Sequence, residues 1–267
     1  MWQIAWRELR DRKWSLLAYS VGSLAMLWLY VATFRSSQSS TQQLQELLKA
    51  YPKGFLEALG MSDLTLNTIE EYLNAKHFSL LWPLVAIILA LSRGGAQIAG
   101  EIQAGTMGLL LALPLQRWRI VAAKYAAGLI TILIFTALSV FGVIPLAQAY
   151  NIPTDSGILL STWVLTVLFM WAIYSAALAV SSWVSESGKV YAIMAATLFL
   201  TYVANIIALV DGKFEWLKYY SLFYYFNTQE VLSSGHITSQ ALIVFGGIIV
   251  AGTVITVWRF SNRDISV

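Results

Sequence analysis

The chain has 267 residues, of which 58% are hydrophobic and only 12% are charged, and it contains no cysteine. Soluble globular proteins carry about 25% charged residues, so this composition and a mean hydropathy of +0.66 exclude a soluble protein and indicate a polytopic membrane protein. The lack of cysteine excludes disulfides and thiolate metal sites, and a net charge of only +3 does not point to nucleic acid as a partner.

The first 14 residues are predicted to form a basic amphipathic helix at the membrane surface. Trp2, Trp6 and Leu9 fall on one side at helical spacing, and charged residues occupy the rest. Tryptophan and arginine side chains are typical of the headgroup layer; a solvated lead-in to the first span is the alternative. The apolar run that follows is too long for the core of a signal peptide and has no small-residue cleavage site after it, so we expect an uncleaved first span.

Six apolar segments are each long enough to form a helix across a hydrocarbon core of roughly 30 Å, which takes about 20 residues. The predicted spans are residues 15–34, 78–99, 120–147, 157–183, 190–210 and 240–258. Together with the N-terminal helix they predict an all-α membrane fold, organised as a single transmembrane domain over residues 1–267.

Basic residues are distributed unequally between the two sides of this predicted bundle. The side that holds both termini has 11 basic and 5 acidic residues, whereas the opposite side has 6 basic and 9 acidic residues. Because loops rich in lysine and arginine are retained in the cytoplasm, both ends of the chain are predicted to be cytoplasmic. The expected location is the inner or plasma membrane.

The two larger segments on the outer side are expected to contain short helices. In residues 41–77, leucines recur at helical spacing, Pro52 interrupts the pattern, and Gly60 ends a second short helix. Residues 211–239 are crowded with aromatic side chains. This crowding favours a belt at the membrane interface over a surface that contacts substrate.

The most distinctive stretch is residues 92–125, where one apolar span ends and a basic cluster leads into the next. Arg93, Gln97 and Glu101 recur every four residues, so they share one helix face, which is directed either to water or to a neighbouring helix. The glycine pair at residues 94–95 would let a second backbone approach this helix closely.

A leucine-rich helix is predicted in the middle of this stretch, over residues 107–113. Gly105 and Thr106 predict its start, because a threonine oxygen can cap free backbone N–H groups. Pro114 is expected to end it. Its four leucines lie in a segment too short to cross a bilayer. Two interpretations stay open: the helix packs beneath its own bundle, or it docks a cytoplasmic partner.

Several kinds of chemistry are missing from the sequence. It has no G-x-x-x-x-G-K-[ST] pattern, so the chain carries no phosphate-binding loop of its own. The two histidines, His77 and His236, lack the spacing of a metal site, so we expect no catalytic residue, no cofactor, no metal and no enzymatic activity. The centres of the spans carry no ionisable residue, Asn205 being the deepest polar group, which argues against ion-coupled transport.

One segment follows a pattern with defined order and spacing, E-x-x-x-G-T-x-x-x-L-L-x-x-P-x-x-R, through the residues Glu101, Gly105, Thr106, Leu110, Leu111, Pro114 and Arg117. This pattern resembles the cytoplasmic signature of type-2 ABC transporter permeases, and Lys124 also fits. The likeness extends over the whole chain in the amphipathic start and the six spans, although only the block 101–124 is specific. The dipeptide at residues 103–104 departs from the family, since many relatives carry charge there.

The resemblance implies a permease subunit of an ATP-binding-cassette transporter, more specifically an exporter. Its cytoplasmic segment 101–119 would couple to a separate ATPase subunit that binds the ATP, and the seven residues of the pattern would form the coupling site. The implied partners are two ABC ATPase subunits, a second permease copy in a homodimer or heterodimer, and the lipid bilayer. The alternative is a non-transporting membrane assembly protein that docks a cytoplasmic partner through the same segment.

Overall fold

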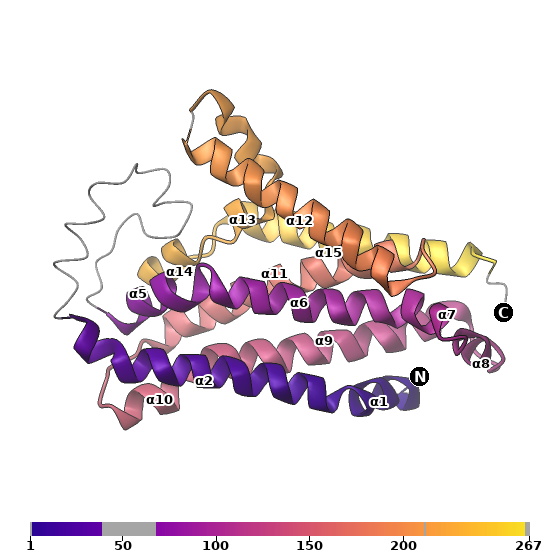
Figure 1. Ribbon diagram of the computed structural model, residues 1–267, viewed down its shortest axis with the longest axis horizontal. Coiled ribbons are helices and arrows are strands. Elements are labelled where there is room, and N and C mark those ends of the chain that lie inside the picture. The colour runs from indigo at the N-terminus through magenta and orange to yellow at the C-terminus, as the bar shows by residue number, and fades with distance from the viewer. Residues whose placement is uncertain (1, 39–67, 211, 265–267) are drawn as a thin grey trace.

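The computed structural model describes residues 2–38, 68–210 and 212–264. These residues are helical with no strand among them, and six helices are long and apolar enough to cross a membrane. Figure 1 shows the long helices side by side, with α1 (Trp2–Asp11) at one end of the bundle and α5 (Ile69–Leu73) at the other. The predicted all-α membrane fold with six spans is confirmed.

The six spanning helices follow the predicted segments to within about one helical turn. They are α2 (Lys13–Gln38), α6 (Leu81–Gly95) with η2 (Ala96–Gly100) and α7 (Glu101–Gln103), α9 (Arg117–Phe141) with α10 (Val143–Ala149), α11 (Ser156–Ser181), α12 (Ser187–Val210) and α15 (Ser239–Asn262). The second span begins at Leu81 and not at residue 78, and it continues beyond the predicted end at residue 99 to Gln103. Its polar residues Arg93 and Gln97 are buried against other helices instead of marking the membrane edge.

The remaining helices are short. They are α8 (Met107–Leu111), η1 (Asn74–Phe78), η3 (Gly212–Tyr220), α13 (Leu222–Tyr225) and α14 (Thr228–Ser234). The helix predicted over residues 107–113 is therefore present as α8, and it lies at the same end of the bundle as α1 (Figure 1). The short helices predicted around Pro52 and Gly60 lie outside the described residues.

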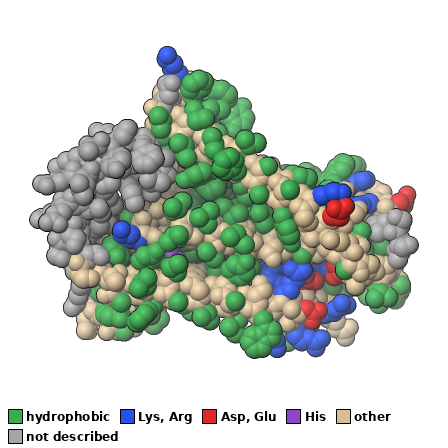
Figure 2. Space-filling model, viewed as in Figure 1, with side chains coloured by type: hydrophobic (Ala, Val, Ile, Leu, Met, Phe, Trp, Pro, Cys, Tyr) green, Lys and Arg blue, Asp and Glu red, His purple; other side chains and the backbone are tan. Residues whose placement is uncertain are grey.

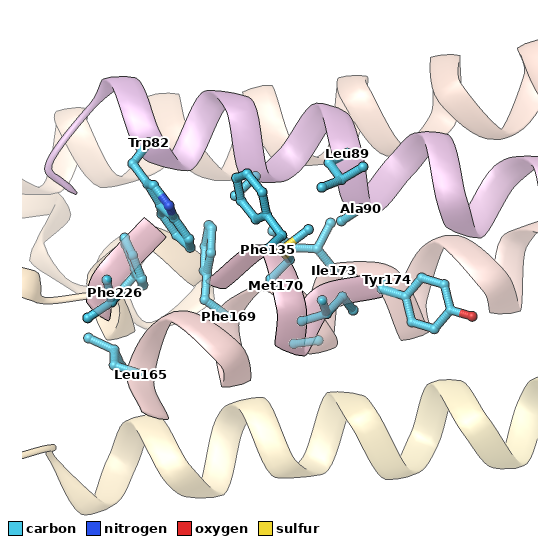
Figure 3. Packing of buried hydrophobic residues seen from close by; sticks show 14 of the residues in the cluster. Trp82, Leu89, Ala90, Phe135, Leu165, Phe169, Met170, Ile173, Tyr174 and Phe226 are labelled. Atoms are coloured by element: carbon cyan, nitrogen blue, oxygen red, sulfur yellow. The ribbon is translucent and has the colours of Figure 1, made fainter. Parts of the chain in front are cut away.

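Helix α11 is the centre of the bundle. It contacts α6, α9, α12 and α15, and it is the most deeply buried of the six spans. In the half of the bundle nearer α5, rings from three helices stack around it: Phe169 of α11 lies 4.2 Å from Phe226, and Trp82 lies 6.1 Å from Phe135 and 5.9 Å from Phe226 between ring centroids (Figure 3). These stacked rings fix the relative positions of α6, α9 and α11.

Phe226 belongs to the aromatic segment that the sequence places at the membrane interface. Trp216 and Tyr219 of that segment are 56% and 53% exposed, but Phe226 is only 7% exposed and is part of the core. An aromatic-rich sequence does not distinguish an interfacial ring from one that a chain reversal turns inward, and the segment contains both kinds.

The glycine pair in α6 allows two helices to approach closely. A Cβ atom on Gly94 would lie 2.6 Å from the Cβ of Ala177 in α11, and a Cβ atom on Gly95 would collide with the ring of Tyr191 in α12. The close backbone approach expected from this pair is therefore present. It holds the end of α6 against both neighbours.

Candidate functional site

Lys124 is the centre of an ion-pair cluster at the end of the bundle that carries α1 and α8. The residue is only 1% exposed, and its Nζ lies 2.9 Å from Glu101 Oε1 and 3.2 Å from Glu8 Oε2. A buried ammonium group is costly unless opposite charges surround it. Two carboxylates satisfy Lys124, and they tie α9 to α7 and to α1.

Arg12 extends this cluster from α1 to the second span. Its Nε lies 3.4 Å from Glu8 Oε1, and its Nη1 donates to the backbone carbonyl of Ser92 at 3.3 Å. Arg93 donates in return to the backbone carbonyl of Arg12 at 3.0 Å. The chain between α1 and α2 is thus bonded in both directions to α6.

The polar stripe of Arg93, Gln97 and Glu101 faces neighbouring helices and not water. Gln97 is 1% exposed; its Nε2 donates to the backbone carbonyl of Lys124 at 3.0 Å, and its Oε1 accepts from the Tyr174 hydroxyl at 2.7 Å. The sequence left open whether this stripe faces water or a neighbouring helix, and in the structure it faces neighbouring helices. The stripe joins the second span to α9 and α11.

The second span widens into one turn of π-helix, η2, within this stripe. In an α-helix the N–H of Ala99 would bond the carbonyl of Gly95. Instead the Ser181 hydroxyl of α11 lies between them, accepting from the Ala99 N–H at 2.9 Å and donating to the Gly95 carbonyl at 3.1 Å. A side chain inserted into the backbone ladder is a recognised cause of a local break in a helix, and π-turns are frequent at functional sites.

Gly105 forms the turn between α7 and α8. Its φ of +69° lies in the left-handed region, which glycine adopts without steric cost. The N–H of Thr106 donates to the Glu101 carbonyl at 3.0 Å and that of Gly105 to the Ile102 carbonyl at 3.1 Å, the two hydrogen bonds of a Schellman motif. Space is not the constraint, because no described atom lies within 4 Å of an added Cβ. The backbone conformation requires the glycine.

Thr106 does not cap α8 with its side chain, contrary to the prediction. Its φ of −84° and ψ of −14° are helical, whereas a capping residue needs an extended backbone. The hydroxyl donates to Glu101 Oε2 at 2.5 Å. Since the other oxygen of Glu101 accepts from Lys124, Thr106 connects α8 to the ion-pair cluster.

The leucines of α8 and the turn after it divide into a buried and an exposed set. Met107 and Leu110 are 1% and 6% exposed, whereas Leu109 is 73% and Leu113 is 42% exposed. Leu110 lines a cavity of about 160 Å³ against α1, and Leu111 is half-buried against the core. The first interpretation therefore holds for Leu110, which packs within its own chain, whereas Leu109 is exposed and the docking of a partner on this helix stays a prediction.

Pro114 and Arg117 lie beyond α8. Pro114 is exposed in the turn that follows the helix. Arg117 begins α9 and donates to the backbone carbonyl of Arg263 at 2.5 Å, and Arg263 donates to the carbonyls of Ser182 and Val184, both at 2.9 Å. Arg117 is thus joined to the residue after α15 and to the loop between α11 and α12.

Gln103, where the family pattern often has charge, bonds the start of α12. Its Oε1 accepts from the N–H and from the hydroxyl of Ser187, both at 3.0 Å. The first turn of a helix has N–H groups without partners in that helix, and the neutral amide satisfies one of them.

A comparison of the chain with known protein families identifies its family. The family model described as "ABC-2 family transporter protein" matches residues 2–265. The chain belongs to this family. A search of curated proteins found no match. Family membership makes the chain a multi-pass permease subunit of an ABC transporter, which works with an ABC ATPase and is not the ATPase itself.

Some residues of the ion-pair cluster in this permease were not predicted from the sequence as site residues. Of the seven named residues, Glu101 binds Lys124 and Thr106 binds Glu101, but Glu8, Arg12 and Tyr174 were missed. One signal was available: a stripe of polar residues at four-residue spacing in an apolar span needs polar partners at the same depth. The stripe predicts that polar partners exist, but it does not predict which distant segment supplies them.

Proposed function

We propose that this permease couples ATP hydrolysis by a separate ABC ATPase to the export of a substrate, and that the ATPase docks on the exposed side of α8. The observation that carries the proposal is the buried Lys124, held between Glu8 and Glu101 at one end of α8. Glu101 also accepts from Thr106 at the start of α8, so these contacts join a helix with an exposed leucine to α1, α7 and α9.

The exposed side of α8 supports the docking step. Leu109 is 73% exposed and Leu113 is 42% exposed, and Pro114 between α8 and α9 is exposed as well. Charged side chains gather at this end of the bundle, while apolar side chains cover its middle (Figure 2). Uncovered leucines among charged residues are typical of a surface that a protein partner covers.

The polar contacts support the coupling step. A displacement of α8 would act through Thr106 on Glu101, and from Glu101 through Lys124 on α9 and α1. Gln103 carries the same movement to Ser187 at the start of α12. Because ion pairs and hydrogen bonds hold these elements together, they would move as one body when the ATPases approach each other.

The direction of transport and the assembly rest on the family and on the charge distribution. The excess of basic residues at the α1 and α8 end favours a cytoplasmic position for that end, where an ATPase has access to ATP. We infer a complex of two permease copies, identical or similar, with two ATPase subunits, and an exporter located in the inner or plasma membrane.

Two neighbouring leucines supply the test. In membranes that contain the cognate ATPase, Leu109→Asp should abolish co-purification of the ATPase and leave the abundance of the permease unchanged. A charge buried without a partner at an interface costs ~2–5 kcal/mol, which weakens binding roughly 30-fold or more. Leu110→Asp is the matched control and should lower the abundance of the permease, because Leu110 is buried within its own chain. Normal ATPase binding by Leu109→Asp would exclude α8 as the docking helix.

A further inference from the structure

A second site lies between α2 and α6, in the half of the bundle nearer α5. A cavity of about 370 Å³ is lined by Gly22 and Met26 of α2, by Leu81, Trp82 and Ile88 of α6, and by His77 of η1. This volume falls within the range of small-molecule sites. The described residues that line the cavity are apolar or neutral, without a charged side chain among them.

Two buried polar groups in this lining have no hydrogen-bond partner among the described residues. His77 is 3% exposed and Trp82 is 1% exposed, yet both ring nitrogens of His77 and the Nε1 of Trp82 are unpaired. The rings of Tyr30 and Phe78 lie 5.8 Å and 5.0 Å from the His77 ring and supply apolar surroundings. Nearly all buried polar side chains in proteins are hydrogen-bonded. Two such side chains without partners beside a cavity therefore point to a molecule that occupies it.

The chemistry of His77 restricts that partner. Burial lowers the pKa of His77 to about 4, so at neutral pH the ring has one nitrogen that donates and one that accepts. A water molecule would satisfy these nitrogens but would leave the apolar side chains along α2 and α6 uncovered. An anionic headgroup would need a positively charged partner, which the described lining lacks.

We propose that this cavity binds an uncharged amphiphile from the bilayer, whose hydroxyl or ester carbonyl bonds His77 and Trp82. Its apolar chain would lie along α2 and α6 between Gly22 and Ile88. Ile88 follows Leu81 by seven residues, so the apolar part of the cavity extends along about 10 Å of α6, the length of a short acyl segment. The inference does not depend on ATPase docking at α8.

A photoreactive diacylglycerol with a diazirine in one acyl chain tests the proposal on the purified full chain. It should label peptides that contain residues 18–26 and 81–88, and unlabelled diacylglycerol should compete. The matched variants are Gly22→Leu and Gly246→Leu, because an added Cβ meets no described atom within 4 Å at either position and only Gly22 lines the cavity. Gly22→Leu should reduce labelling about tenfold or more, and Gly246→Leu should leave it unchanged.

His77→Leu provides a second test with two readouts of opposite sign. Labelling should fall several-fold because the polar contact is lost, while the melting temperature of the ligand-free protein should rise because an unpaired buried group is removed. Undiminished labelling of Gly22→Leu would overturn the proposal, as would equal labelling by an anionic phosphatidylglycerol probe of the same chain length. If the neutral probe fails to label and Gly22→Leu instead changes the oligomeric mass, the cavity is a contact between two copies and the proposal fails.

Discussion

Lys124 Nζ lies 2.9 Å from Glu101 Oε1, although the two residues belong to different spans on either side of α8. This ion pair closes the base of the segment that holds α8, and the Glu8 carboxylate at 3.2 Å extends it to α1. The same contact satisfies a buried ammonium group and fixes the position of a helix with an exposed leucine. The coupling that we propose for this end of the bundle would therefore depend on the same side chains that stabilise it.

Lys124→Met should destabilise the permease by about 3–5 kcal/mol, because it leaves the Glu101 carboxylate without its cation and leaves Glu8 with Arg12 alone. Thermal unfolding in detergent and abundance in the membrane measure the effect. The double variant Lys124→Met with Glu101→Gln should recover part of the loss, since it removes the carboxylate that has lost its cation. A Lys124→Met protein as stable as the wild type would mean that the buried pair makes no net contribution.

Ser181→Ala should destabilise the permease by about 1–3 kcal/mol, because it leaves the Ala99 N–H and the Gly95 carbonyl without the hydroxyl that separates them. Ser182→Ala is the matched control: both serines are fully buried, but the Ser182 hydroxyl bonds only the carbonyl of Ala179 in its own helix. Hydrogen exchange should be faster at the Ala99 amide in Ser181→Ala alone. Equal effects of the two substitutions would show that the inserted hydroxyl has no special role in η2.

Acidification should destabilise the permease through His77. Its pKa in the folded protein is about 4 against an ordinary value of 6.5, so between these values the unfolded chain binds more protons. The stability that comes from keeping His77 neutral is complete above pH 6.5 and is lost as the pH falls toward 4. At pH 5 the loss is about 2 kcal/mol. The melting temperature should fall more steeply from pH 7 to pH 5 in the wild type than in His77→Leu. Parallel curves would show that His77 does not titrate in this range.

The sequence predicts the six spans and the short helix between the second and third, because apolar length and turn residues are local properties. Gly105 is an example: its turn follows from glycine, and it adopts the left-handed backbone that such a turn needs. The sequence does not predict that the polar face of the second span is buried, because a polar stripe looks the same whether it faces water or polar partners on other helices.

The composition of the cluster could be predicted only in part. Glu101 belongs to a spaced pattern and Lys124 stands out near the start of an apolar span. Glu8 lies 116 residues from Lys124 in sequence, and the contact exists only because α1 packs against α9. The same limit applies to Leu109 and Leu110, which are neighbours in sequence and face opposite surroundings in the fold.

Accessibility of a cysteine at Leu109 tests the central claim most directly, because the chain has no native cysteine. In inverted membrane vesicles stripped of the ATPase, a membrane-impermeant maleimide should label Leu109→Cys, and adding the ATPase back should block the labelling. In intact cells the same reagent should label Ser233→Cys, whose position is exposed at the opposite end, and should not label Leu109→Cys. If Leu109→Cys is labelled equally with and without the ATPase, or is labelled from outside intact cells, α8 is not the cytoplasmic docking helix.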